Sequence, residues 1–286
     1  MISDKERRQL RQGILYIVAT PIGNLEDITL RAVRILKEVS LIAAEDTRRT
    51  KKLLNAYEIG TPLTSLYEHN ELKKSGTLVA RMMEGSDVAY VSDAGTPGIS
   101  DPGYLLVKKA LASGIVVMPV PGACAATTAL SVSGLPMDSF VFYGFLPGKS
   151  GKRQHFLKSL KDETKTMVFY ESPNRIIATL RDVESILGNR QIVVTRELTK
   201  IYEEILRGSV TEVIEAFGDR VVKGEITIVI AGKEGMEMPC SGEDIRRLLA
   251  LYEGKTLSKR DLIGKIALEL GIPRNLVYRE AMMAKV

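Results

Sequence analysis

The class of fold is indicated most clearly by VAYVSDAGTPGISDPG, Val88 to Gly103. Its first four residues are β-branched, aromatic or small, as in a buried strand, and they lead into Ser92, Asp93 and a loop rich in Gly and Pro. Ligands of open α/β sheets bind beyond the carboxyl ends of the strands, so this loop would bring backbone groups and the Asp93 carboxylate close to a small molecule. The alternative is a tight β-to-α turn in which Asp93 or Ser100 only caps the next helix.

Strand and helix patterns alternate on both sides of this stretch. The strand-like runs are ILYIVAT, LIAAE, PLTSLY, VAYV and VVMPV, and helical patterns follow them, the last being a small-residue helix from Ala123 to Ser131. Five βα units of this length predict a doubly wound, mostly parallel sheet. The turns PIGN, EDT, SDAGTPG and VPGA would then all lie at one edge of that sheet.

The pattern changes near Leu135. QIVVTREL is followed by YEEILRG with no helix between them, which predicts an antiparallel pair within a second, mixed sheet. We therefore expect an N-terminal α/β domain at 1–134, a C-terminal α/β domain at 135–239 and a tail of three short helices at 240–286. The tail fits either a helix-turn-helix-like module or a docking appendage for another subunit.

Composition narrows the class of protein. The chain has 286 residues, 45% of them hydrophobic, and two cysteines, Cys124 and Cys240, that form no metal-ligand pattern. We therefore expect no disulfide and no metal site. Because no apolar signal region or transmembrane stretch is present, we expect no membrane partner and a cytoplasmic location. G-x-G-x-x-G and G-x-x-x-x-G-K-[ST] are both absent, so the ligand should lack a pyrophosphate.

The net charge of +5 is unevenly distributed. One cluster follows LIAAE, a second lies near residue 153, and residues 240–286 hold nine Lys and Arg against six Asp and Glu. Each cluster alone fits a solvated helix face, but together they favour a polyanionic partner. The candidates for RNA binding are Arg48, Arg49, Lys51, Lys52, Lys152 and Arg153.

Five motifs carry a family resemblance. They are LYIVATPIGNLEDITLRA at 15–32, AEDTRRT at 44–50, VSDAGTPGISDPG at 91–103, PVPGACAATTAL at 119–130 and FYESPNR at 169–175. In these motifs the chain resembles the tetrapyrrole methylase superfamily and, within it, the family of ribosomal RNA small subunit methyltransferase I. The resemblance implies a two-domain α/β fold with S-adenosylmethionine between the domains, and a homodimer. It also implies methyl transfer to the ribose 2′-hydroxyl of a cytidine in 16S rRNA of the small ribosomal subunit.

The motifs also supply candidate site residues. Backbone groups and a carboxylate suit a sulfonium donor that carries no phosphate. The expected donor-binding residues are Pro21, Gly23, Asp93, Ala94, Gly95, Thr96, Gly98, Ile99, Ser100, Pro121, Gly122, Ala123 and Tyr170. A ribose hydroxyl is a poor nucleophile, so a base should assist the transfer. The expected catalytic residues are Asp93, Asp46, Glu171 and Arg31, whereas His69 and His155 are expected at the surface.

Two other functions remain open at this stage. The chain could methylate a tetrapyrrole, or it could be a non-catalytic RNA-binding assembly protein. The basic clusters and the charged tail favour RNA over a tetrapyrrole, and the intact glycine loops weigh against a non-catalytic role.

Overall fold

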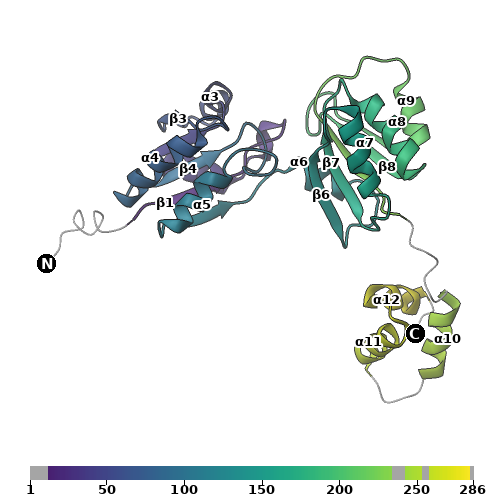
Figure 1. Ribbon diagram of the computed structural model, residues 1–286. Coiled ribbons are helices and arrows are strands. Elements are labelled where there is room, and N and C mark those ends of the chain that lie inside the picture. The colour runs from purple at the N-terminus through teal and green to yellow at the C-terminus, as the bar shows by residue number, and fades with distance from the viewer. Residues whose placement is uncertain (1–11, 234–241, 253–257, 284–286) are drawn as a thin grey trace. The chain divides into compact units, whose positions relative to one another are not determined.

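Two five-stranded sheets form the larger part of the molecule (Figure 1). The computed structural model describes residues 12–233, 242–252 and 258–283. The chain divides into two compact units, 1–233 and 234–286, which are described separately below. Among the described residues, no helix combines the length and the apolar character needed to cross a bilayer.

The first sheet is parallel, as the alternating pattern predicts. Its strands are β1 (Ile14–Val18), β2 (Leu41–Ala44), β3 (Leu63–Ser65), β4 (Val88–Val91) and β5 (Val116–Val120), in the order β3-β2-β4-β1-β5. LIAA and VAYV form its fully buried strands β2 and β4, because helices cover both faces. Since all strands run the same way, the turns after β1, β2, β4 and β5 meet at one edge.

Two pairs of helices sandwich this sheet. A short 3₁₀ turn (η1, Leu25–Asp27) precedes α2 (Leu30–Glu38), which covers one face together with α3 (Thr47–Ala56). The other face packs against α4 (Glu71–Met83) and α5 (Tyr104–Ala112). Helix α4 begins at Glu71, whose side chain is buried.

Glu71 decides between the two interpretations of the loop after β4. Its buried carboxylate accepts hydrogen bonds from the backbone N–H groups of Gly103, Leu105 and Leu106 at 3.0, 2.9 and 3.2 Å. The N-terminus of α5 is therefore capped from α4, and neither Asp93 nor Ser100 is needed for that purpose.

The second sheet is mixed. Its strands are β6 (Phe140–Phe145), β7 (Thr166–Glu171), β8 (Gln191–Arg196), β9 (Glu204–Ser209) and β10 (Ile226–Ile230), in the order β6-β7-β10-β8-β9. Strands β6 and β7 are parallel and the other pairs are antiparallel, including the predicted β8–β9 pair. One face packs against α7 (Ser150–Ser159), α8 (Ile176–Leu187) and α9 (Val210–Phe217).

The small-residue helix α6 (Ala125–Ser131) packs on the opposite face of the second sheet. Ala126 and Ala129 share a buried cluster with Val168 of β7 and Val229 of β10. The helix follows β5 of the first sheet directly, so the chain enters the second layer before the boundary predicted near Leu135. That boundary lies in the connection after α6 and stays a prediction.

The described residues of the smaller unit form three helices, so the helical tail expected from the sequence is present. They are α10 (Gly242–Tyr252), α11 (Lys259–Leu270) and α12 (Arg274–Met283), and their apolar faces form one buried cluster. Gly271 ends α11 in the left-handed conformation, at φ 65°, and Ile272-Pro273 leads into α12. The helix-turn-helix interpretation of this unit stays a prediction.

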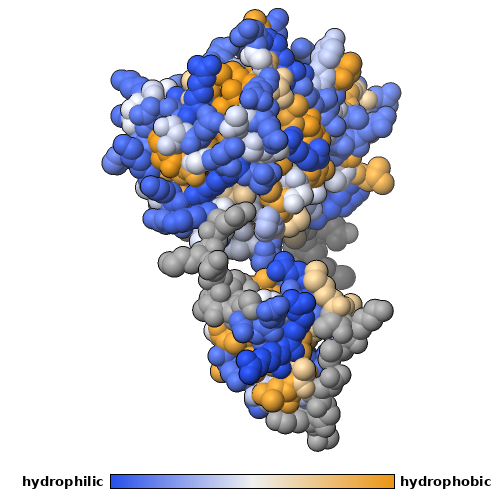
Figure 2. Space-filling view, turned by 90° about the vertical axis from the view of Figure 1, so that its right-hand side faces the viewer, coloured by the Kyte–Doolittle hydropathy of each residue, from blue (hydrophilic) through white to orange (hydrophobic). Residues whose placement is uncertain are grey.

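The face shown in Figure 2 is mainly hydrophilic, with apolar residues in separate patches. The thiol of Cys124 is free and half-buried, whereas Cys240 lies outside the described residues. Within the described ranges no group of three or more His, Cys, Asp or Glu could hold a metal ion.

Candidate active site

Hydrogen bonds join the turns at the edge of the first sheet. The backbone of Thr20, after β1, exchanges two hydrogen bonds with that of Gly95, at 2.9 and 3.0 Å. The Thr96 hydroxyl donates to the Ala123 carbonyl at 3.1 Å, and the Asp46 N–H donates to the Asp93 carboxylate at 2.9 Å. The four predicted turns thus form one continuous wall.

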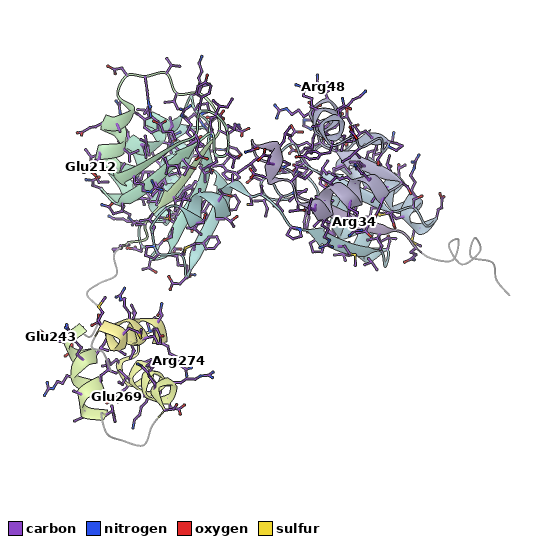
Figure 3. The ribbon with its side chains drawn as sticks, turned by 180° about the vertical axis from the view of Figure 1, so that it is seen from behind. Arg34, Arg48, Glu212, Glu243, Glu269 and Arg274 are labelled. Atoms are coloured by element: carbon purple, nitrogen blue, oxygen red, sulfur yellow. The ribbon has the colours of Figure 1, made fainter. Side chains whose placement is uncertain are left out.

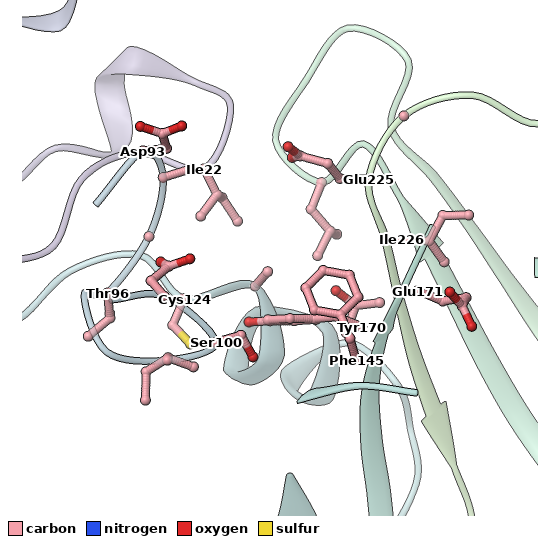
Figure 4. Close-up of a pocket in the computed structure, with 18 of the residues that line it drawn as sticks. Ile22, Asp93, Thr96, Ser100, Cys124, Phe145, Tyr170, Glu171, Glu225 and Ile226 are labelled. Atoms are coloured by element: carbon pink, nitrogen blue, oxygen red, sulfur yellow. The ribbon is translucent and has the colours of Figure 1, made fainter. Parts of the chain in front are cut away.

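This wall lines a cavity of about 420 Å³, whose other wall comes from the second sheet (Figure 4). The first wall includes Ile22, Glu45, Arg49, the segment 93–96, the segment 99–101, Cys124 and Ala125. The second wall includes Phe145, Tyr170, Glu171, Ser172, Pro173, Thr195, Leu198 and the segment 224–227. Figure 4 shows Asp93, Thr96 and Cys124 on one side, and Tyr170, Phe145 and Ile226 on the other.

Three carboxylates lie together in the first wall. Asp93 pairs with Arg49 at 3.2 Å, and its backbone N–H donates to Glu45 at 3.2 Å. Burial raises the pKa of Asp101 to about 6, an effect that a hydrogen bond from Ser92 opposes and the charges of Glu45 and Asp93 reinforce. Burial is also the main cause that raises the pKa of Glu45. Asp101 can therefore accept a proton near neutral pH.

Glu171 lies in the second wall but has a different environment. Its carboxylate accepts hydrogen bonds from Ser172 N–H, from the Arg175 guanidinium and from the Thr179 hydroxyl, each at 2.7 Å. The side chain is fully buried. With its lone pairs occupied in this way, Glu171 fixes the connection from β7 to α8, and the expected catalytic role is not supported by its contacts.

Asp46 and Arg31, the other expected catalytic residues, lie outside the cavity. Asp46 caps α3 through Arg48 N–H at 2.8 Å, and its bonds to Arg48 lower its pKa to about 2. A carboxylate with so low a pKa is a weak base. Arg31 is exposed in the first turn of α2.

The expected donor-binding residues fall into three groups. Those that line the cavity are Asp93, Ala94, Gly95, Thr96, Ile99, Ser100 and Tyr170. Pro21 and Gly23 instead line a neighbouring cavity of about 280 Å³. Gly98, Pro121, Gly122 and Ala123 line neither cavity. Close packing explains the glycine at position 122, because a Cβ there would lie 3.0 Å from the Cβ of Ala19.

The neighbouring cavity shares a border with the first. Ile22, Arg49, Asp93, Ala94 and Glu225 line both cavities. The second also contains Lys52 of α3 and Lys200, whose ammonium group pairs with Glu225 at 2.9 Å. A second reactant could therefore reach the first cavity from the side of α3.

The expected RNA-binding cations do not share one environment. Arg48, Arg49, Lys51 and Lys52 are exposed on α3, and Lys152 is exposed on α7. The expectation for Arg153 is wrong, because its side chain is 4% exposed and binds Asp182 of α8 at 2.6 Å. This ion pair joins α7 to α8 and leaves Arg153 unable to reach RNA.

Sequence reasoning missed part of the site. Glu45 and Asp101 carry a signal in the sequence, since both lie in turns already identified, EDT and ISDPG. Phe145, Thr195 and Ile226 carry none, because they come from strands of the second sheet without a loop motif.

Comparisons with known proteins agree with this geometry. A family model for Tetrapyrrole (Corrin/Porphyrin) Methylases matches residues 14–214. Ribosomal RNA small subunit methyltransferase I of Halalkalibacterium halodurans is 46% identical over 271 residues, 93% of this chain and 94% of that protein. The protein of the same name from Thermotoga maritima is 52% identical over 222 residues, 78% of this chain and 100% of that protein.

Solved structures show the same fold. Cobalt precorrin-4 methyltransferase has a TM-score of 0.59 at 18% identity, covering 76% of this chain and 94% of that one. A diphthine synthase has a TM-score of 0.59 at 13% identity, covering 77% and 90%. The chain therefore belongs to the tetrapyrrole methylases and, among them, to the family of ribosomal RNA small subunit methyltransferase I.

Proposed function

We propose that this methyltransferase transfers a methyl group from S-adenosylmethionine to the 2′-hydroxyl of a cytidine in 16S rRNA, on small ribosomal subunits in the cytoplasm. One observation carries the proposal. A carboxylate-rich cavity built from glycine loops borders a second cavity that opens beside the cationic helix α3. The relatives' names supply the class of RNA, and the family resemblance supplies the 2′-hydroxyl.

The first cavity fits the chemistry of this donor. Carboxylates outnumber the one arginine in its lining, which suits a ligand with a sulfonium and an ammonium group. Phe145 and Tyr170 offer aromatic surfaces against which a purine ring can pack. When bound, the donor would supply an electrophilic methyl group on a positively charged sulfur.

We assign to Asp101 the role of the base that accepts the proton of the acceptor hydroxyl. That proton must leave as the oxygen is methylated, and a carboxylate with a pKa of about 6 is ionised at neutral pH while remaining basic enough to accept it. Asp93 would act beside it by holding Arg49 at the border of the two cavities. Positioning of the two reactants can itself lower the barrier by roughly 7–11 kcal/mol.

The acceptor would approach across α3. Phosphate contacts position RNA without reading its sequence, and each contact adds to the salt dependence of binding. Replacing Arg48, Lys51 and Lys52 by Ala should therefore weaken subunit binding and flatten its salt dependence. Arg49 is left in place in this variant because it also lines the donor cavity.

A homodimer is part of the proposal. Strand β5 is an edge of the first sheet, and Val116 and Met118 on it are exposed. An exposed apolar edge strand favours association with another chain, and a second copy related by two-fold symmetry would bury it. Light scattering should report a dimer, and a monomer at micromolar concentration would reject this part.

Labelled S-adenosylmethionine tests the reaction. The enzyme should transfer label to small ribosomal subunits and not to tetrapyrrole precursors, and mass spectrometry of the RNA should find the methyl group on one ribose. Label on a tetrapyrrole alone, or on a base, would overturn the proposal.

A further inference from the structure

The helical unit carries a groove between α11 and α12. This tail groove has a volume of about 530 Å³. Its lining residues are Lys259, Arg260, Ile263, Arg274, Asn275 and Tyr278. The described residues that line it include three cations and no carboxylate. The surface inside the groove is mainly apolar, so the groove favours a ligand that combines negative charge with an apolar or aromatic surface.

Close helix packing positions one of these cations. A Cβ at Gly264 of α11 would lie 3.3 Å from an Nη atom of Arg274 and 3.5 Å from its Cζ atom. Because Gly264 has no side chain, the guanidinium of Arg274 can lie across α11, where Arg274 lines both the tail groove and an adjoining depression. Figure 3 shows Arg274 and Glu243 on opposite sides of this unit.

Two of the three cations that line the tail groove are arginines available to a negatively charged ligand. Neither Arg260 nor Arg274 has an ion-pair partner among the described residues. Both arginines also line an adjoining depression that contains Asp261 and Glu269, whose carboxylates accept hydrogen bonds from Ser258 at 2.6 Å and Tyr252 at 3.0 Å. The first turns of α11 and α12 add the partial positive charge of two helix N-termini.

An aromatic side chain completes the groove. Tyr278 is 52% exposed and lies one turn after Arg274 on the same face of α12. Ile263 is buried and supplies an apolar floor. Cations beside an exposed aromatic ring are the combination that binds a backbone phosphate and stacks an unpaired base.

We propose that the tail groove binds single-stranded RNA, with Arg260 and Arg274 on backbone phosphates and Tyr278 against a base. The identity of the RNA as the substrate rests on the function proposed above. The family model ends at residue 214, and the Thermotoga maritima relative is matched over its whole length by 78% of this chain. The groove thus lies outside the part of the chain that the family model matches. A second RNA contact on the same chain raises overall affinity without taking part in the chemistry.

The test compares two full-length double variants of equal charge. Arg260→Ala with Arg274→Ala removes the groove cations, and Arg247→Ala with Arg279→Ala removes two exposed tail cations that do not line the groove. Binding of a fluorescent RNA hairpin with an unpaired loop should weaken roughly tenfold in the first variant, with a salt slope smaller by about one per lost contact. The control should bind like wild type. Tyr278→Ala should weaken binding without changing the salt slope, and Tyr278→Phe should restore it.

Methylation separates the groove from the reaction. With small ribosomal subunits, the groove variant should raise KM and leave kcat and donor affinity unchanged. If the groove and control variants bind the hairpin equally, the proposal that the tail groove binds RNA is wrong, even if the wild type methylates subunits normally. Tighter, groove-dependent binding of a matching DNA hairpin would overturn RNA as the occupant. Failure of the wild type to methylate subunits would instead reject the proposed function. The hairpin measurements would still show whether the tail groove binds RNA.

Discussion

The two walls of the first cavity both present carboxylates, but in different environments. Glu171, from the second sheet, is fully buried and receives hydrogen bonds from three neighbouring residues. Asp101, from the first sheet, is partly buried among other carboxylates, and its pKa is raised to about 6. A position in the cavity therefore does not make a carboxylate a base. Its contacts decide whether the charge stabilises the fold or remains available for a reaction.

The largest effect should follow loss of the saturated carboxylate. Glu171→Ala leaves the guanidinium of Arg175 and two further donors without their acceptor, so the free energy of unfolding should fall by about 3–5 kcal/mol. Urea denaturation measures this change. Asp162→Ala, at an exposed ion pair, is the control and should stay within about 0.5 kcal/mol of wild type. A loss below about 1 kcal/mol for Glu171→Ala would contradict the structural role.

Activity should depend instead on Asp101. The methylation rate of wild type should fall as pH drops through about 6, because a protonated Asp101 cannot accept the hydroxyl proton. Asp101→Asn should slow single-turnover methylation roughly 100-fold at neutral pH and remove this pH dependence. Asp46→Asn is the matched control, since Asn also caps helices and Asp46, with a pKa of about 2, is ionised throughout. An unchanged pH profile in Asp101→Asn would assign the base elsewhere.

A pair of glycines can separate cavity shape from backbone strain. Gly95 has φ 81° and lines the cavity, where a Cβ would lie 3.3 Å from Ile22. Gly98 has a similar φ of 83°, but a Cβ there meets nothing within 4 Å. Both Ala variants should lose about 1–2 kcal/mol of stability, because an L-residue is strained at such φ values. Donor affinity, measured by calorimetry, should fall only in Gly95→Ala. Equal donor affinity in the two variants would show that this loop serves the fold alone.

The smallest effect concerns stability at Asp101. Its pKa rises from 3.8 to about 6 on folding, so the folded state binds this proton more tightly, and its stability falls as pH rises through that window. Asp101→Asn removes this penalty and should raise the free energy of unfolding at pH 7 by about 1 kcal/mol, a value reduced for solvent screening. The gain should vanish below pH 3.8. Destabilisation at pH 7 would show that the ionised group stabilises the fold.

The sequence predicted the first wall well because its signal is local. Each parallel strand ends in a turn with its own Gly, Pro or acidic residues, and parallel pairing brings these ends together. It could not rank the carboxylates. The donors to Glu171 lie within eight residues of it but reach it only in the folded connection from β7 to α8, and the burial of Asp101 depends on the whole fold. The cap on α5 comes from Glu71, 32 residues before Gly103, and the partner of Arg153 is Asp182, 29 residues later. Phe145, Thr195 and Ile226 of the second wall were missed because they lie within strands that carry no turn motif.

Helix α6 has a consequence for attempts to isolate the first sheet. Its Ala126, Ala129 and Leu130 are buried against strands that come later in the chain. A fragment ending at residue 134 would keep this helix and lose the surface that covers it, so three apolar side chains would face water. Such a fragment should aggregate, whereas one ending before Cys124 would not carry that exposed face. The two sheets are thus linked in their folding by a helix that one supplies and the other covers.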